Sequence, residues 1–353
     1  MKHPARLFVG IGALLALVGF VGSCTGPRAK SAAPAPYMRV VQTEDGAIQL
    51  QIALRSFTPP RPTAPVIWLA AVAHIGDSNY YHALQRRLDE QPLVLFEGVG
   101  RPDAGDDAPA KPDVAGRPHN PWMRHAADDS LQSTMASSLG LVFQLEAIDY
   151  DRPHFRNSDL SLRQIQRLLT GPPGKAAGDT GTKPNAQFIA LMQVMDGHSL
   201  LGMIAQFGMR LLGSSPKLQA MTKLMLIEIF GQLNGDFTKM GAASPEIKEL
   251  LRVLIESRNQ IVLEDLKVEL KKDRPPASLA VFYGAGHMGD LQKRLVRELR
   301  YRPGTDVWLT AFSVNPSQTG LSASDVNLVR SMVKWQLDAL SPPDEKTGER
   351  SRH

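Results

Sequence analysis

The sequence Val66-Ile67-Trp68-Leu69-Ala70-Ala71-Val72-Ala73-His74-Ile75-Gly76-Asp77 decides the fold. Its first seven residues are an apolar run of strand length, and a helical pattern follows at 79–89. A second run, Leu279-Ala280-Val281-Phe282-Tyr283, leads in the same way to Gly286-His287-Met288-Gly289-Asp290 and another helical pattern. Each turn presents a histidine where a strand ends, and ligands of α/β sheets bind at the carboxyl ends of strands. The repeat therefore predicts an α/β fold with function at these two turns.

The segments around the first turn predict a βαβ unit. A second buried strand at 93–96 ends at Glu97, and a short helical connection makes two strands parallel and adjacent. His74 and Glu97 are therefore expected at the same edge of the sheet. A Gly-containing turn at 44–46 between β-rich runs at 38–43 and 48–54 predicts an opening hairpin.

The rest of the chain continues an α/β pattern. We predict a mixed, largely parallel sheet flanked by helices, with a Met-rich helical insertion at about 186–240. The other expected elements are a strand at 144–148, a polar turn at 149–159, a helix at 245–271, a strand at 279–283, a helix at 290–300, a strand at 307–312 and a helix at 325–340. The α/β domain is therefore expected to span 37–340, followed by a disordered tail at 341–353.

Arg258 interrupts the apolar stripe of the helix predicted at 245–271. A buried guanidinium requires an anionic partner, because an unpaired charge inside a protein costs several kcal/mol. The alternative is an arginine that extends past the edge of the core to reach water.

The first residues predict export. Lys2 and Arg6 precede an apolar stretch at 7–22, which is short for a membrane span, and the segment ends in Val21-Gly22-Ser23-Cys24. That ending resembles a bacterial lipobox, which predicts a signal peptide at 1–23, lipidation of Cys24 and a flexible tether at 24–36. Cys24 is the only cysteine, so an internal disulfide is excluded. The alternative is an ordinary signal peptide with an incidental cysteine. We expect a protein anchored by lipid to the bacterial cell envelope, on the outer-membrane or periplasmic side.

Charge argues against nucleic acid as a partner. The 353 residues carry a net charge of only +5, and the basic residues are scattered rather than gathered in one patch. The expected partners are a peptide or small-molecule substrate and the membrane.

His74, His287 and Glu97 form the ligand set expected for a divalent transition metal such as Mn, Co or Zn, with positions left open for water and substrate. Glu97 could instead act as a general base, and Arg258 could hold a substrate carboxylate or stabilise an oxyanion. For each histidine alone, the simpler interpretation is a polar residue satisfied at a strand end.

The order of these motifs resembles the TraB/GumN/Tiki superfamily, which is related to ChaN-like and erythromycin-esterase-like proteins. The resemblance covers most of 66–312: a first histidine turn, a strand ending in Glu97, Arg258-Asn259 after a variable helical region, and Gly284-Ala285-Gly286-His287. Ala71 stands where the family has glycine, and residues 155–159 resemble a further family segment.

This resemblance implies an α/β domain and a metal-dependent peptidase, with Glu97 and Arg258 as catalytic residues. It also implies that Asn157, Asp159 and Asn259 line the cleft. A non-catalytic protein that binds a peptide or small ligand in the same cleft is the alternative, and an envelope scaffold with no site is a third. If the protein is a peptidase or a binding protein, His74, Glu97 and His287 should converge in one cleft. Arg258 should then lie on the wall of this cleft, and the helical insertion should cover it.

Overall fold

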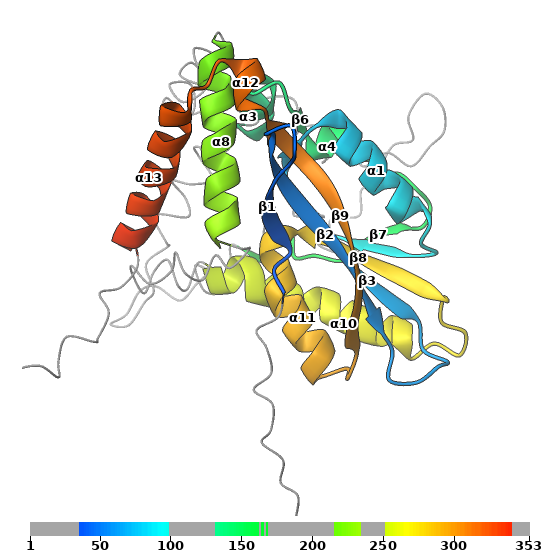
Figure 1. The fold of residues 1–353 in the computed structure, drawn as a ribbon. Helices are drawn as coiled ribbons and strands as arrows, with labels where there is room; N and C mark the ends of the chain where they lie inside the picture. The colour runs from blue at the N-terminus through cyan, green and yellow to red at the C-terminus, as the bar shows by residue number, and fades with distance from the viewer. Residues whose placement is uncertain are drawn as a thin grey trace, which may run out of the picture. The chain divides into compact units, whose positions relative to one another are not determined.

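A computed structural model describes residues 35–98, 131–161, 164–165, 167–168, 215–233 and 251–340 of the chain (Figure 1). Its main sheet has seven strands in the order β1-β2-β3-β8-β5-β7, with β9 paired to the free edge of β2. The signal peptide, the tether, the polar tail, Cys24 and much of the predicted helical insertion lie outside the described residues.

Four strands form the parallel part of the sheet: β3 (Val66–Val72), β8 (Ser278–Gly284), β5 (Val94–Phe96) and β7 (Phe155–Asn157). All neighbouring pairs among them are parallel. The prediction that the strands before and after the first helix are adjacent is wrong, because β8 lies between them. A strand that arrives about two hundred residues later completes the centre of the sheet, which a local βαβ argument cannot foresee.

The antiparallel part consists of β1 (Met38–Gln42), β2 (Ile48–Thr58) and β9 (Arg302–Val314). β1 and β2 form the predicted hairpin, and Gly46 occupies its turn at φ +83°, a conformation that glycine adopts without strain. β2 then pairs with β3 on one edge and with β9 on the other. The mixed, largely parallel α/β fold is confirmed.

Helices cover both faces of the sheet. Figure 1 shows α1 (Ser78–Asp89) on one face and α10 (Arg258–Leu270) and α11 (Met288–Arg297) on the other. α8 (Pro216–Leu233) packs against the antiparallel strands, and α13 (Ala323–Leu340) and the short α12 (Pro316–Thr319) pack against α8. α8 is the described part of the predicted helical insertion, and its Lys223 lies near enough to Asp77 of the first histidine turn for each charge to act on the pKa of the other.

Two local predictions are wrong. The segment expected as a strand at 144–148 forms the helical turn α4 (Gln144–Ala147) instead. Directly before it, the short β6 (Val142–Phe143) follows α3 (Leu131–Ser138) and pairs with β4 (Ile75–Gly76). The polar turn expected at 149–159 contains β7. Its polar residues suit an edge strand because each finds a partner: the Arg156 guanidinium, for example, donates to Glu269 at 2.6 Å.

The helix predicted at 245–271 is described from residue 251. A π-helical turn, η2 (Arg252–Ser257), precedes α10, so the change of helical geometry falls directly before Arg258. Such π turns occur often at functional sites. Here, both Arg258 and Asn259 are buried at the start of α10.

Candidate functional site

The two histidine turns lie side by side because β3 and β8 are paired along their whole length, with Val72 opposite Gly284. His74 follows β3 by two residues, and His287 ends the 3-10 turn η3 (Ala285–His287) after β8. Three tertiary contacts hold the first turn: the Tyr81 hydroxyl donates to the Ala73 carbonyl, the Tyr80 hydroxyl accepts from the Ala73 N–H, and the Asp77 N–H donates to the Ala311 carbonyl.

Glu97 lies at the end of β5, next to β8. Its backbone N–H donates to the Phe282 carbonyl at 3.0 Å, and its Oε2 accepts the Gly284 N–H at 2.7 Å. Oε1 accepts from Arg258 Nη2 at 2.6 Å. Burial opposes the charge, but Arg258 above all, then His287 and His74, hold the pKa of Glu97 well below its ordinary value. Glu97 is therefore an ionised carboxylate beside both histidine turns.

Arg258 is buried and bridges two carboxylates. Its Nε and Nη2 donate to the two oxygens of Asp159 at 2.9 and 2.6 Å, Nη2 also donates to Glu97, and Nη1 donates to the Leu254 carbonyl at 3.3 Å. Burial works against its charge, yet Glu97 and Asp159 raise the pKa of the guanidinium. The structure thus supplies the anionic partners that a buried arginine requires, and every guanidinium nitrogen already contacts a protein acceptor.

His287 is 7% exposed, and its imidazole lies between α10 and Glu97. Its Nδ1 is 2.8 Å from the Asn259 Oδ1, and its Nε2 is 3.6 Å from the Glu97 Oε1. Asn259 also donates to the His287 carbonyl and to Asp290. Burial lowers the pKa of His287 to about 4, although Glu97 works in the opposite direction. The imidazole is therefore neutral near pH 7.

His74 is exposed, and a glutamine holds its ring. Its Nδ1 is 2.9 Å from the Gln144 Oε1, and its carbonyl accepts the Gln144 N–H at 2.8 Å. A Cβ placed on Gly284 would lie 3.4 Å from His74 Nε2 and 3.2 Å from the Glu97 Oε2, so both atoms border the same point. The structure therefore brings His74, Glu97 and His287 together at the ends of β3, β5 and β8.

Two further predicted cleft residues, Asn157 and Asp159, contact the backbone of Gly98, the residue after Glu97. Asp159 accepts the Gly98 N–H at 3.0 Å and pairs with Arg258. Asn157 donates to the Gly98 carbonyl at 2.8 Å, and a Cβ on Gly98 would lie only 2.2 Å from its Nδ2. These contacts fix the backbone that directly follows Glu97.

Sequence reasoning missed Gln144 and its partner Tyr150. Gln144 is buried, and its Nε2 donates to the Tyr150 hydroxyl at 2.7 Å. The expected strand at 144–148 placed it in an ordinary sheet segment, and no motif surrounds it. Only the pairing of β4 with β6 carries Gln144 to His74.

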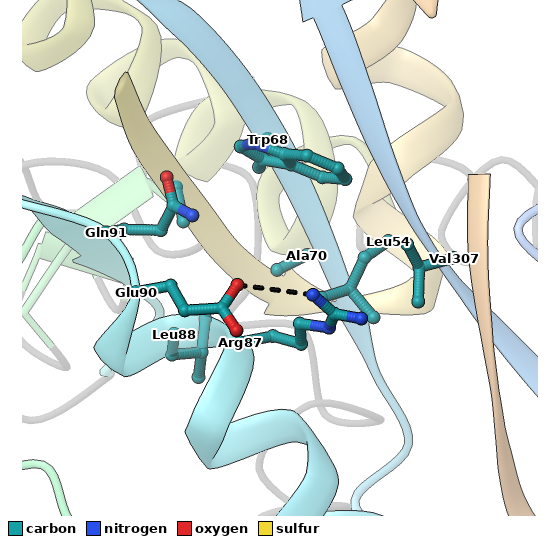
Figure 2. A pocket seen from close by; sticks show the side chains of 9 residues that line it. Leu54, Trp68, Ala70, Arg87, Leu88, Glu90, Gln91 and Val307 are labelled. Atoms are coloured by element: carbon teal, nitrogen blue, oxygen red, sulfur yellow. Dashed lines mark hydrogen bonds and ion pairs between the residues drawn. The ribbon is translucent and has the colours of Figure 1, made fainter. Parts of the chain in front are cut away.

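A cavity lies on the α1 face of the sheet, near the loop that enters β5. Figure 2 shows Trp68 on one side and the ion pair of Arg87 with Glu90 across from it, with Gln91 beside them. Its volume of about 20 Å³ is room for a water molecule rather than for a substrate. Its lining includes none of the predicted site residues.

Among the described residues, no group of three or more His, Cys, Asp and Glu side chains could hold a metal ion as arranged here. No helix in the described part of the chain is long and apolar enough to cross a membrane. The chain matches none of the protein-family models, curated proteins or solved structures with which it was compared.

Proposed function

We propose that this protein is a metal-dependent hydrolase, most simply a peptidase of the TraB/Tiki type, whose metal ligands are His74, His287 and Glu97. One observation carries the proposal. Each imidazole has its Nδ1 against the oxygen of a side-chain amide, Gln144 for His74 and Asn259 for His287. Because an amide oxygen only accepts, the opposite nitrogen of each ring is left as the basic atom, which is how metal-binding histidines are commonly oriented.

The chemistry of the donors fits Mn, Co or Zn. Two imidazole nitrogens and one ionised carboxylate are ligands that these ions accept. The Nε2 of His287 and the Oε1 of Glu97 are 3.6 Å apart, close to the roughly 3.4 Å between two ligands of one tetrahedral ion. Since the three side chains do not form a metal site as they stand, binding requires at least one of them to move.

A bound ion of this kind would supply Lewis acidity and activate water near neutral pH. The protein's own residues would bind and orient it. Arg258 keeps Glu97 ionised, and its full set of protein contacts suits the holding of Glu97 better than the capture of a substrate carboxylate. We propose that Arg258 is a positioning residue unless a substrate displaces Asp159 from it.

Metal content and activity test this proposal together. The full-length protein should bind Mn, Co or Zn stoichiometrically by elemental analysis and titration, and should hydrolyse members of a peptide library with at least one of them. The double variant His74→Ala, His287→Ala should lose both properties. The matched control, His82→Ala with His154→Ala, removes two histidines outside the site and should keep both. A wild-type protein that binds no metal would refute the proposal.

The second candidate is a non-catalytic binding protein that uses the same surface. It is favoured by the saturation of Glu97 and Arg258, since both carboxylate oxygens and all guanidinium nitrogens already contact protein groups. Such a protein would bind peptides in calorimetry without turning them over, and the binding would survive metal chelation.

We propose that a lipid on Cys24 anchors the protein to the cell envelope. Cells fed a radiolabelled or clickable fatty acid should label the wild-type chain and not the Cys24→Ala variant. Labelling of both chains, or of neither, would contradict the anchor.

A further inference from the structure

We propose that Gln144 is the positioning residue of His74: it holds the imidazole with the proton on Nδ1 and turns Nε2 toward Glu97. The inference rests on the proposed function, because it assigns the residue that prepares one of the three ligands. Gln144 itself contacts neither metal nor substrate in this assignment.

Two contacts from one residue hold His74. The β4–β6 pairing places Ile75 opposite Phe143, and the next positions along the two strands are His74 and Gln144. The Gln144 N–H donates to the His74 carbonyl at 2.8 Å, and the Gln144 Oε1 lies 2.9 Å from His74 Nδ1. The main chain and the ring of His74 are thus fixed by the same neighbour, although the histidine is exposed.

The far end of the amide has a partner of its own. The Gln144 Nε2 donates to the Tyr150 hydroxyl at 2.7 Å. The ring of Tyr150 lies 5.1 Å from that of Phe96 and stacks at 6.0 Å on that of Phe282. Burial raises the pKa of Tyr150, so the hydroxyl stays neutral; it accepts from the amide nitrogen here, and a hydroxyl that donated to the amide oxygen instead would go with the other tautomer of His74. Phe96 directly precedes Glu97, so the aromatic contacts that place Tyr150 also involve the strand that presents Glu97.

The chemical consequence follows from the inventory of donors and acceptors. An amide oxygen cannot donate, so the nitrogen facing it must carry the proton of a neutral imidazole. The lone pair of His74 is then on Nε2, the atom that borders Gly284 together with the Glu97 Oε2. The reverse arrangement, with the amide turned over and the proton on Nε2, would leave His74 unable to ligate a metal through that atom.

Two substitutions at Gln144 separate positioning from packing. Gln144→Glu keeps an acceptor against Nδ1, whereas Gln144→Met keeps the volume and removes the acceptor. Positioning predicts that the glutamate variant binds Co²⁺ at least as tightly as wild type and that the methionine variant binds it 10- to 100-fold more weakly. A packing role predicts the opposite order, since methionine fills the space and glutamate buries a charge. Gln292→Met is the matched control, because Gln292 is also buried and hydrogen-bonded, to Arg55 and Tyr37.

The tautomer itself is measured by nitrogen-15 NMR of the histidine rings in metal-free, full-length protein at pH 8. The wild type and Gln144→Glu should show His74 protonated on Nδ1, and Gln144→Met should show a mixture or the Nε2 form. If the methionine variant does not fold, Tyr150→Phe replaces it, because that change frees the far end of the amide and should also yield a mixture.

The tautomer and the Co²⁺ affinity together distinguish a failure of the positioning role from a failure of the metal-dependent function. A tautomer that depends on Gln144 in a protein that binds no Co²⁺ would uphold the positioning role and refute the metal-dependent function. A wild-type His74 protonated on Nε2, or one whose tautomer and Co²⁺ affinity survive Gln144→Met, would overturn the positioning role.

Discussion

The two histidine turns are alike in sequence and differ in what surrounds them. His74 is exposed and is held by Gln144, which directly follows β6, the strand that pairs with β4 in the first histidine turn. His287 is buried and is held by Asn259, which arrives on a helix next to the ion-paired Arg258. Both rings nevertheless have Nδ1 against an amide oxygen.

This difference teaches that the orientation of a ring and its environment are set separately. A histidine can be oriented by one local neighbour at the surface or by a charged, buried network, and the hydrogen bond at Nδ1 is the same. The burial differs, and burial controls the proton affinity and the contribution to stability. We therefore expect the His287 side to carry the stability of the site and the His74 side to carry its adaptability.

The largest expected effect concerns the charged network beside His287. Arg258→Met leaves Glu97 and Asp159 buried without their common cation, which should cost about 3–5 kcal/mol in the free energy of unfolding. Arg87→Met is the control, because its pair with Glu90 at the end of α1 is exposed on both sides and should contribute below about 1 kcal/mol. Urea denaturation measures both, and equal losses would show that the buried side has no special role.

Acid should destabilise the protein through the buried histidine. The pKa of His287 is about 4 in the folded protein and about 6.5 when unfolded, so the unfolded chain binds more protons between these values. Its contribution is full above pH 6.5 and is lost as the pH falls to 4, by at most about 3 kcal/mol. The difference between metal-free wild type and His287→Gln in denaturation from pH 7 to 4 isolates it. A difference independent of pH would contradict the burial of a neutral imidazole.

Removing each ring tests the comparison directly. His287→Ala should cost about 1–3 kcal/mol, because it leaves Asn259 Oδ1 without its partner in the core and removes the edge contact with Tyr283. His74→Ala should cost about 0.5 kcal/mol or less, since its side chain is exposed and water can take its place at the Gln144 Oε1. Thermal melts of the two metal-free variants measure both losses of stability. A larger loss in His74→Ala than in His287→Ala would contradict the difference in burial between the two turns.

A further effect is expected at the point that both turns share. Gly284→Ala places a methyl group 3.2 Å from the Glu97 Oε2 and 3.4 Å from His74 Nε2, tighter than ordinary contact, and should cost on the order of 1 kcal/mol. The control is Gly289→Ala in α11, where a Cβ meets nothing within 4 Å and alanine should be neutral or stabilising. A Gly284→Ala protein as stable as the control, with unchanged metal affinity, would show that the two turns are farther apart in solution.

Much of the fold was predictable because its strands are buried on both faces and therefore read as continuous apolar runs. β3 and β8 are of this kind, and the hairpin of β1 and β2 is marked by its turn. β7 and α4 escaped prediction for a physical reason. β7 is an edge strand whose polar side chains find partners such as Glu269, and α4 replaces a strand where Gln144 turns to meet His74.

By itself, the sequence determined which side chains stand at strand ends and that a buried Arg258 needs an anion, because both follow from local periodicity and the cost of an unpaired charge. Only the tertiary structure decided which anions pair with it, that β8 lies between β3 and β5, and that Gln144 and Asn259 face the two imidazoles. Those outcomes depend on pairings between segments far apart in the chain, whose energies are fixed by packing and hydrogen-bond geometry rather than by any local pattern.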